Sequence, residues 1–479
     1  MTITSPAFVV FITLVVLLTN ALPTPAGRRA VLLLASVTFI ASQVERAVQL
    51  LPLAIFLLVS WALIEGARLS RSPKLLWVGL ASLIAGFVFL KRYSFLNSSL
   101  LLPFPYLIVG LSYVLFRVLH LLIDAQQGEL PERISALSFV NYTCNFLTFT
   151  AGPIERYQAY AERQRATLSL TEEQVFRSFR RIITGFVKVS VVSAIFDYLF
   201  SGVSARLLGA APSLPLASFA GMYLAAAVSY TVYLYANFAG YMDIVIGVGW
   251  LIGQELPENF NQPFLARSFL EFWSRWHMTL SDWFKTYLFN PLLKALATRF
   301  TSAEIAPYLA AIAFFVTFLV MGIWHGSTSV FVIYGLLLGA GASLNKAWQV
   351  TMNKRLGKKR YKLVAERPLF IYLSRGLTTA YFALALSCLW LDMPQLRGIV
   401  AHLGFFGVAA CYCALAIAVA GSFFAWDGAA AGLSRLQPRS DGALGGVVPR
   451  NLGLGLRIML IALVSTFFHK APEFVYRAF

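Results

Sequence analysis

The side chains best suited to chemistry lie in one eleven-residue segment, which begins at Glu271 and ends at Ser281. It holds a carboxylate, a guanidinium, two indoles, an imidazole and hydroxyl groups within an otherwise apolar chain. Read as a helix, it places Glu271 and Arg275 four residues apart, so that they can pair. The same reading puts Trp273, His277 and Ser281 on one stripe. Placing such polar groups near a bilayer costs free energy unless they find partners. A chain that nevertheless contains them is expected to use them, so the segment predicts a functional site. The alternative is an interfacial helix with its tryptophans at headgroup level.

A second histidine, His325, favours the functional interpretation. The chain is nearly continuously apolar over 307–344, which is too long for one membrane span at a rise of 1.5 Å per residue. The break at His325–Ser329 predicts that two helices meet there. Gly322 and Gly326 form a small-residue pair that allows close helix approach around Trp324 and His325. An imidazole at such a break is well placed for chemistry, whereas the alternative is a loop histidine at the water interface.

Two histidines 48 positions apart suit general base catalysis. A neutral imidazole near pH 7 can take a proton from an alcohol, which can then attack an activated acyl group such as a thioester. The alternative class is a proton-coupled transporter that uses histidine and aspartate as a relay. The chain contains no phosphate-binding Gly-rich loop, no nucleophile elbow, no paired-histidine metal motif and no internal repeat. We therefore expect no bound metal and no bound cofactor.

The composition predicts an all-α polytopic membrane protein. Of 479 residues, 58% are hydrophobic and only 13% are charged, and the mean hydropathy is +0.71. In such a chain the net charge of +18 is expected to reflect cytoplasmic Lys and Arg loops rather than nucleic-acid binding. The four cysteines have neither metal-ligand nor paired spacing and are expected to be small core residues.

Apolar stretches predict about 11–13 membrane segments. The N-terminal stretch is expected to be a signal-anchor with its end outside, since it lacks a basic start and Arg28 and Arg29 follow it. A short apolar stretch at 137–152 ends in a Gly-Pro break and predicts a re-entrant or interfacial element. The polar stretch 434–450 is expected to be a loop. The predicted spans are 6–22, 30–44, 48–66, 75–90, 100–123, 182–208, 216–235, two within 307–344, 369–391, 399–425 and 451–468.

Further polar residues complete the candidate site. Asn237 and Asp243 lie beside glycines that allow helices to approach, so a buried, partnered Asp243 is expected. Asn259 and Asn261 lie in a turn-rich connector that leads into the Glu271 segment. The basic loop that follows Glu155 is either a plain topology signal or a docking face for an acidic carrier or for cofactor phosphates. Its candidate docking residues are Arg156, Arg177, Arg180 and Arg181.

Five motifs in order resemble the membrane-bound O-acyltransferase family. They are FTAGPIER at 149–156, NFAGY at 237–241, PENFNQP at 257–263, EFWSRWH at 271–277 and GIWHG at 322–326. The resemblance implies that His325 is the catalytic histidine and His277 the second one. It also implies a ring of tilted helices around a central tunnel, with Glu271, Trp273 and Arg275 on a supporting helix. Trp324, Ser281 and the asparagines and aspartate named above are expected to line or support that tunnel.

The resemblance covers about Gly110 to Asn345 and so implies three parts. These are N-terminal transmembrane helices at 1–109, a catalytic core at 110–345 and C-terminal helices at 346–479. The bacterial branch that transfers D-alanyl or acetyl groups is the most similar, which implies a thioester co-substrate on an acyl carrier protein or as acetyl-CoA. It further implies a multi-pass protein of the bacterial cytoplasmic membrane, an extracytoplasmic hydroxyl acceptor and an extracytoplasmic partner transferase. The residues within these motifs are more similar to those of the D-alanyl branch, which favours an aminoacyl donor.

Overall fold

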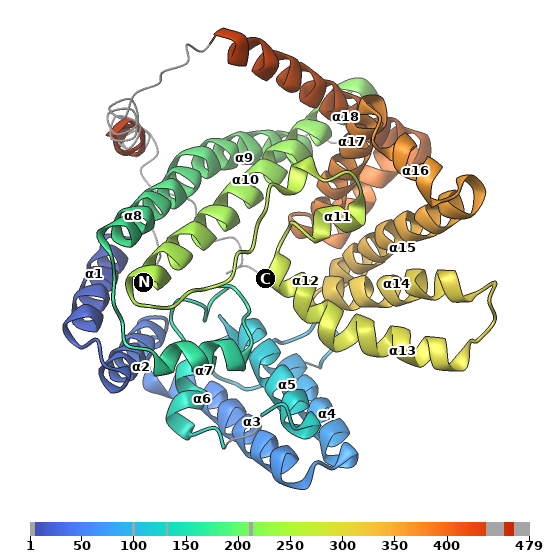
Figure 1. The fold of residues 1–479 in the computed structure, drawn as a ribbon. Helices are drawn as coiled ribbons and strands as arrows, with labels where there is room; N and C mark the ends of the chain where they lie inside the picture. Colours follow the sequence, from blue (N-terminus) through green and yellow to red (C-terminus); the bar gives the residue numbers. More distant parts are fainter. Residues whose placement is uncertain (1–4, 98–100, 131–132, 210–213, 437–454, 464–479) are drawn as a thin grey trace. The chain divides into compact units, whose positions relative to one another are not determined.

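The computed structural model describes residues 5–97, 101–130, 133–209, 214–436 and 455–463, and these residues are overwhelmingly helical (Figure 1). The chain divides into two compact units. The first unit comprises the described residues of Met1–Ser190 and Asn237–Glu258, and the second those of Val191–Ala236 and Asn259–Lys470. These boundaries differ from the division at 110 and 345 that the motifs suggest, which stays a prediction.

Sequence signals account for the ends of the helices in the first unit. Ser5 and Thr24 cap two helices that each begin with proline, and Gly110, at φ 82°, precedes a third. The span predicted at 100–123 therefore begins only at Leu111, because the left-handed glycine ends the preceding irregular stretch. The helices are α1 (Pro6–Ala21), α2 (Pro25–Ala41), α3 (Leu51–Ser70) after the turn η1 (Ala47–Leu50), α4 (Pro73–Leu90), α5 (Leu111–Gln127), α6 (Ala136–Thr143), α7 (Tyr157–Arg165) and α8 (Glu172–Val187).

The second unit is built on longer helices separated by short turns. The long helix α10 (Leu216–Leu251) begins in this unit and ends among the residues of the first. The π-helical segment η3 (Lys188–Ser193) precedes α9 (Ala194–Gly209). The other helices and turns are η4 (Pro263–Leu265), α11 (Phe269–Trp273), α12 (Met278–Phe284), η5 (Lys285–Phe289), α13 (Asn290–Arg299), α14 (Ala306–His325), α15 (Val330–Leu356), α16 (Lys358–Ala365), α17 (Pro368–Ala385), η6 (Leu386–Leu389) and α18 (Met393–Leu436).

Within the described residues, eight helical segments are long and apolar enough to cross a membrane. The chain is thus a multi-pass helical membrane protein, as its composition predicts. Three of the other predicted spans correspond to α1, α2 and α5, which have only 16 or 17 residues. The eight segments are Ala47–Ser70, Pro73–Leu90, Glu172–Gly209, Leu216–Leu251, Ala306–His325, Val330–Leu356, Pro368–Leu389 and Met393–Ala429.

Two predicted irregular regions differ in the structure. The basic loop expected through Arg181 is instead helical, as α7 and then α8. Thr171 and Gln174 form a reciprocal capping box at the start of α8, which explains why a polar stretch begins a helix. At 137–152, the helix α6 ends at Thr143, well before the Gly-Pro break. Of the predicted loop 434–450, residues 434–436 are the end of α18 and the rest lie outside the described residues; of the predicted span 451–468, residues 455–463 are described and are helical.

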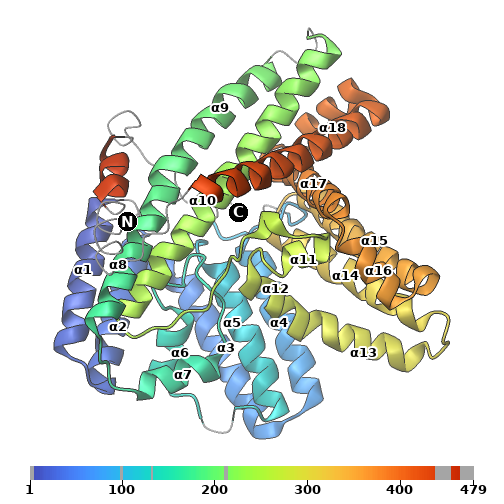
Figure 2. The ribbon, with the colours of Figure 1, turned by 45° about the horizontal axis from the view of Figure 1, so that its top comes forward.

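Helices α14 and α15 form a close antiparallel hairpin, and both views show them side by side (Figures 1 and 2). The predicted break holds, since α14 ends at His325 and α15 begins at Val330. A Cβ at Gly322 would lie 2.1 Å from Cα of Gly335, so only glycine allows this approach. A Cβ at Gly326 would instead meet the ring of Phe331. Both glycines therefore set the position of the hairpin turn that carries His325.

Candidate active site

His325 is the last residue of α14 and its side chain is buried. Its Nδ1 lies 2.7 Å from the carbonyl oxygen of Met321. A carbonyl only accepts, so Nδ1 carries the proton, and the neutral ring has its lone pair on Nε2. The rings of Trp324 and Tyr334 lie edge-on to the imidazole, at centroid distances of 4.9 and 5.5 Å. The hairpin thus holds the imidazole in a defined orientation and tautomer.

The segment around His277 is not one continuous helix, which corrects the single stripe expected for Trp273, His277 and Ser281. Helix α11 ends at Trp273 and α12 starts at Met278. Between them, His277 has φ 46° and ψ 52°, in the left-handed region. Histidine tolerates this region better than most residues, yet such a backbone costs about 1–3 kcal/mol. The left-handed residue redirects the chain, so the imidazole projects from the junction of two short helices.

The connector that contains Asn259 reaches His277 through backbone pairing. Phe260 and Trp276 form an isolated antiparallel bridge, and the N–H of Met278 donates to the carbonyl of Asn259 at 3.0 Å. The N–H of Asn261 donates to the carbonyl of Arg275 at 2.9 Å. These bonds place the Asn259 side chain beside the imidazole although the two residues are 18 positions apart.

The Asn259 amide has one allowed orientation. Its Oδ1 accepts from the backbone N–H and the hydroxyl of Thr279, at 3.1 and 2.9 Å. A backbone N–H can only donate, so the atom facing it must be the oxygen. His277 Nδ1 lies 3.3 Å from the same oxygen and therefore donates to it, which leaves the lone pair on Nε2. Asn259 and His277 are both fully buried. Asn259 Nδ2 is a buried donor with no partner among the described residues.

The two histidines affect each other electrostatically. Burial lowers the pKa of His277, which lies outside the candidate spans, well below its ordinary value. A charge on His325 lowers that pKa further. The structure thus brings the two predicted catalytic residues into one neighbourhood of the second unit. It also disfavours the state in which both rings are protonated.

Aromatic packing fixes the segment that carries His277. Trp276 stacks on Phe272 at 5.5 Å, and Phe382 of α17 packs edge-on to Trp276 at 4.9 Å. Trp273 is buried against Phe318 of α14, at a centroid distance of 5.2 Å. Trp273 therefore joins α11 to the helix that ends at His325. This packing gives the predicted supporting residues Trp273 and Trp324 a physical role in holding the two imidazoles.

The ion pair predicted between Glu271 and Arg275 is present, at 2.8 Å. Each side chain is about one third exposed, so the pair is not deeply buried. It joins α11 to the following turn and does not lie on a helix that carries His277. Ser281 is half-buried in α12, where its backbone N–H donates to the carbonyl of His277. Asn261 is exposed and contributes through its backbone alone in the hydrogen bonds described above.

In the first unit, Asp243 is partnered as expected. One carboxylate oxygen accepts from Arg181 at 3.1 Å and the other from Lys188 at 2.6 Å. Arg181 also pairs with Glu258, at 2.5 and 2.6 Å. The glycines explain this proximity, since a Cβ at Gly240 would lie 2.7 Å from the carbonyl oxygen of α8 that faces it. Arg181 is therefore held in an ion-pair network with Asp243 and Glu258.

The remaining candidates in the first unit have different surroundings. Arg177 lies on α8 with its guanidinium over the Trp250 ring, 4.6 Å from the centroid. Arg180 and Arg156 are exposed. Asn237 is fully buried in α10. In the first unit, the candidate site residues include Asp243, Arg177 and Arg181. The second unit contains the two histidines with Asn259, Trp273 and Trp324.

Several residues of the site were missed in the sequence. Tyr334 and Phe382 contact site residues but belong to no recognisable motif, and Lys188 resembles an ordinary basic residue. Thr279 lies within the Glu271–Ser281 segment, but its contact with Asn259 was not expected. Glu258, in contrast, could have been found, because it immediately precedes Asn259 in the connector motif. Within the described part of the chain, no three His, Cys, Asp or Glu side chains are grouped so that they could hold a metal ion.

Known proteins resemble this chain over about half of its length or more. The sequence profile of the membrane-bound O-acyltransferase family matches residues 44–364. The chain is 30% identical over 235 residues to a teichoic acid D-alanyltransferase of Bacillus subtilis, which covers 48% of this chain and 56% of that protein. It is 31% identical over 263 residues to the same enzyme of Streptococcus thermophilus, with coverage of 53% and 60%.

A second group of relatives bears a different name. The chain is 29% identical over 260 residues to a probable alginate O-acetylase of Azotobacter vinelandii, which covers 53% of this chain and 47% of that protein. The chain therefore spans about half the length of the curated relatives it matches. The family profile covers more than half of the chain and includes both histidines. The chain belongs to the membrane-bound O-acyltransferase family.

Proposed function

We propose that this protein transfers a short acyl group, D-alanyl or acetyl, from a cytoplasmic thioester to a hydroxyl of an extracytoplasmic polymer or carrier. The donor is an acyl carrier protein thioester or acetyl-CoA, and the enzyme works in the bacterial cytoplasmic membrane. The single observation that supports this most directly is the hydrogen bond from His325 Nδ1 to the Met321 carbonyl. It makes Nε2 the basic nitrogen, as deprotonation of an alcohol requires.

In the proposed reaction, His325 Nε2 takes the proton of the acceptor hydroxyl as its oxygen attacks the thioester carbonyl carbon. The C–O bond forms, the C–S bond breaks, and the leaving sulfur takes the proton back from His325 to give a free thiol. The negative charge that develops on the carbonyl oxygen needs a hydrogen-bond donor, typically 2.7–3.1 Å away. The buried Nδ2 of Asn259 is the candidate for this donor.

His277 serves as the second histidine of the proposed site. Its lowered pKa keeps the ring neutral at pH 7, and the charge on His325 opposes its protonation. The pair therefore holds one catalytic proton at a time, which keeps that proton on His325 until the thiol leaves. The nearby aromatic side chains exclude water from the two rings and limit hydrolysis of the thioester.

The proposed partners follow from the donor and the acceptor. A carrier protein would dock through exposed basic residues, for which Arg156, Arg177 and Arg180 are the candidates. An extracytoplasmic partner transferase would receive or position the product. The relatives named as D-alanyltransferases and as O-acetylases support both donors, so the two are to be tested side by side.

The experiment uses the purified protein in detergent with a soluble hydroxyl acceptor. D-alanyl carrier protein and acetyl-CoA are supplied in parallel, and free thiol and acylated acceptor are measured. We expect both products with one of the donors, and neither with the His325→Gln variant. A proton-coupled transporter cannot form acylated product where no membrane separates two sides. Absence of product with both donors, or equal product from the variant, would contradict the proposal.

A further inference from the structure

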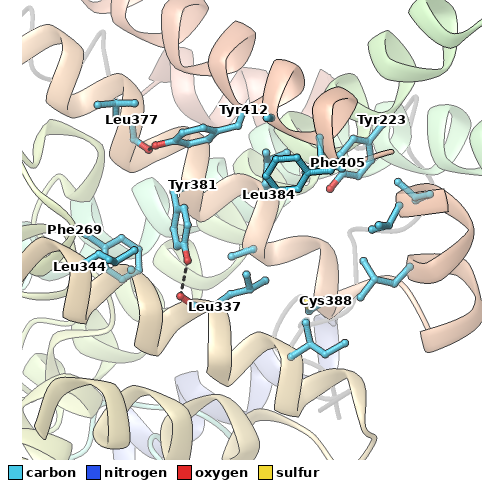
Figure 3. A pocket seen from close by; sticks show the side chains of 18 of the residues that line it. Tyr223, Phe269, Leu337, Leu344, Leu377, Tyr381, Leu384, Cys388, Phe405 and Tyr412 are labelled. Carbon is cyan, nitrogen blue, oxygen red and sulfur yellow. Dashed lines mark hydrogen bonds between the residues drawn. The ribbon is translucent and has the colours of Figure 1, made fainter. Parts of the chain in front are cut away.

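A large apolar cavity lies in the second unit, and neither histidine is among the residues that line it (Figure 3). Its volume is about 1060 Å³, just above the range of about 300–1,000 Å³ that is usual for ligand sites. Helices α15, α17 and α18 supply most of the lining, with Tyr223 from α10 and Phe269 from α11. Aliphatic side chains such as Leu337, Leu344 and Leu384 dominate the wall.

The hydroxyl groups of the tyrosines that line the cavity are hydrogen-bonded to other protein groups. Tyr381 donates to the carbonyl of Leu337 at 2.7 Å, as Figure 3 shows. Tyr412 donates to the carbonyl of Leu377 at 3.3 Å. The hydroxyl of Tyr223 lies 3.0 Å from that of Ser387. Because these hydroxyls are satisfied by the protein, the rings present hydrocarbon to the cavity, which suits a hydrocarbon occupant better than a polar one.

One charged residue is among those that line the cavity. Arg397 lines the cavity, is exposed, and lies in the first turns of α18. That helix begins next to Asp392, whose carboxylate accepts from the N–H of Gln395 at 2.8 Å. Because Met393–Ala429 is a candidate membrane span, Arg397 lies near one end of it, at the level expected for lipid phosphates.

The length of the cavity also fits a lipid. Arg397 and Tyr412 both line it, on either side of the interruption at Gly404. A straight helix would place them about 22 Å apart, and the interruption shortens this distance. Half of a hydrocarbon core is about 15 Å thick, so the lining is comparable in length with one acyl chain. At Gly404, with φ 66°, the helix is interrupted just before Phe405, whose side chain lines the cavity.

We propose that this cavity binds an acyl chain of an anionic phospholipid, with the Arg397 guanidinium on the lipid phosphate. The guanidinium and the phosphate complement each other in charge and in planar hydrogen-bond geometry. This site goes beyond the proposed acyl transfer and involves neither histidine. Its test measures lipid binding alone, so it can fail or succeed independently of the enzymatic proposal.

The test is native mass spectrometry of the full protein, released from detergent after incubation with equimolar phosphatidylglycerol and phosphatidylcholine. Ala409→Trp fills the cavity, whereas Ala410→Trp adds the same side chain next to it; both positions are exposed, and only Ala409 lines the cavity. We expect Ala409→Trp to lose most bound lipid and Ala410→Trp to keep it. Should Ala409→Trp fold poorly, Ala401→Phe fills the same cavity with a smaller ring.

The charge is tested separately at Arg397. We expect Arg397→Gln to bind phosphatidylglycerol roughly tenfold more weakly, because a charge-assisted contact is lost, and to bind phosphatidylcholine unchanged. Arg397→Lys should keep the preference for the anionic lipid. Equal lipid retention by the Ala409 and Ala410 variants would overturn the cavity as the site. Equal affinity of the unmodified protein for both lipids would overturn the role of Arg397.

Discussion

His277 Nδ1 lies 3.3 Å from Asn259 Oδ1, and this contact fixes the tautomer of the imidazole. Thr279 orients the amide, because its N–H and hydroxyl both donate to Asn259 Oδ1. The same oxygen then accepts from His277, which places the proton on Nδ1. The consequence is a basic Nε2 on the His277 ring. Asn259 is thus proposed as a positioning residue for His277.

The first prediction concerns Asn259. In Asn259→Ala, the His277 N–H and the Thr279 N–H lose their acceptor, which costs about 1–3 kcal/mol when the groups are buried. We expect a lower melting temperature and a fall in kcat. Asn259→Asp restores an acceptor, and its charge should raise the pKa of His277 and shift the pH–rate profile. An unshifted profile in Asn259→Asp would contradict the positioning role.

A second prediction follows from the lowered pKa of His277. Below about pH 6.5 the unfolded chain protonates this ring whereas the folded protein does not, so acidification favours unfolding. The contribution to stability is therefore full above that pH and decreases as the pH falls. We expect the melting temperature in detergent to drop between about pH 7 and pH 5, and the drop to be smaller in His277→Asn. Asparagine tolerates the left-handed backbone, so this variant retains the local fold.

The third prediction is that replacing His325 abolishes transfer but leaves folding intact. Loss of a general base typically costs about 10²–10⁴-fold in rate. His325→Gln can still donate a hydrogen bond to the Met321 carbonyl but cannot act as a base. Expression, membrane insertion and the melting temperature are compared with those of the unmodified protein, and transfer is measured in vesicles. Transfer at a near-normal rate by the variant would remove His325 from its proposed role.

The fourth prediction concerns the pair of Glu271 and Arg275. If the pair were deeply buried, its loss would cost about 3–5 kcal/mol, but both side chains are about one third exposed. Glu271 also accepts from the backbone N–H of Arg267 at 2.8 Å, at the start of α11. We expect Glu271→Ala to cost about 1 kcal/mol, and Glu271→Gln, which keeps an acceptor, to cost less. Lost activity at unchanged thermal stability would instead indicate a catalytic role for Glu271.

The fifth prediction separates docking from structure on α8. Arg181→Gln removes a partner from Asp243 and Glu258 and should lower the melting temperature, because the partly buried Asp243 carboxylate loses one of its two cationic donors. Arg180→Gln, one position away and exposed, should leave stability unchanged and raise the KM for a carrier-protein donor. The KM is measured at two salt concentrations, since an exposed charge contact weakens with salt. A KM unchanged by Arg180→Gln would exclude it from docking.

Some of the site was determined by local sequence. The hairpin break after His325 follows from the length of the apolar run, and the pair of Glu271 and Arg275 follows from four-residue spacing in and beyond α11. The partnered Asp243 follows from the glycines around it, because a carboxylate beside closely packed helices must find a donor. The ion pair depends on residues that are close in the chain. The break and the partnered carboxylate depend on the length of a membrane span and on the cost of an unpaired charge.

Only the tertiary structure determined what holds the histidines. Nothing in the sequence predicted that His277 would adopt a left-handed backbone and divide its helix, because that strain is maintained by aromatic packing against distant helices. The contact between Asn259 and His277 depends on a backbone bridge between segments that no periodicity relates. The cavity beside Arg397 likewise arises between three helices, so its size depends on how their side chains pack rather than on any one stretch of sequence.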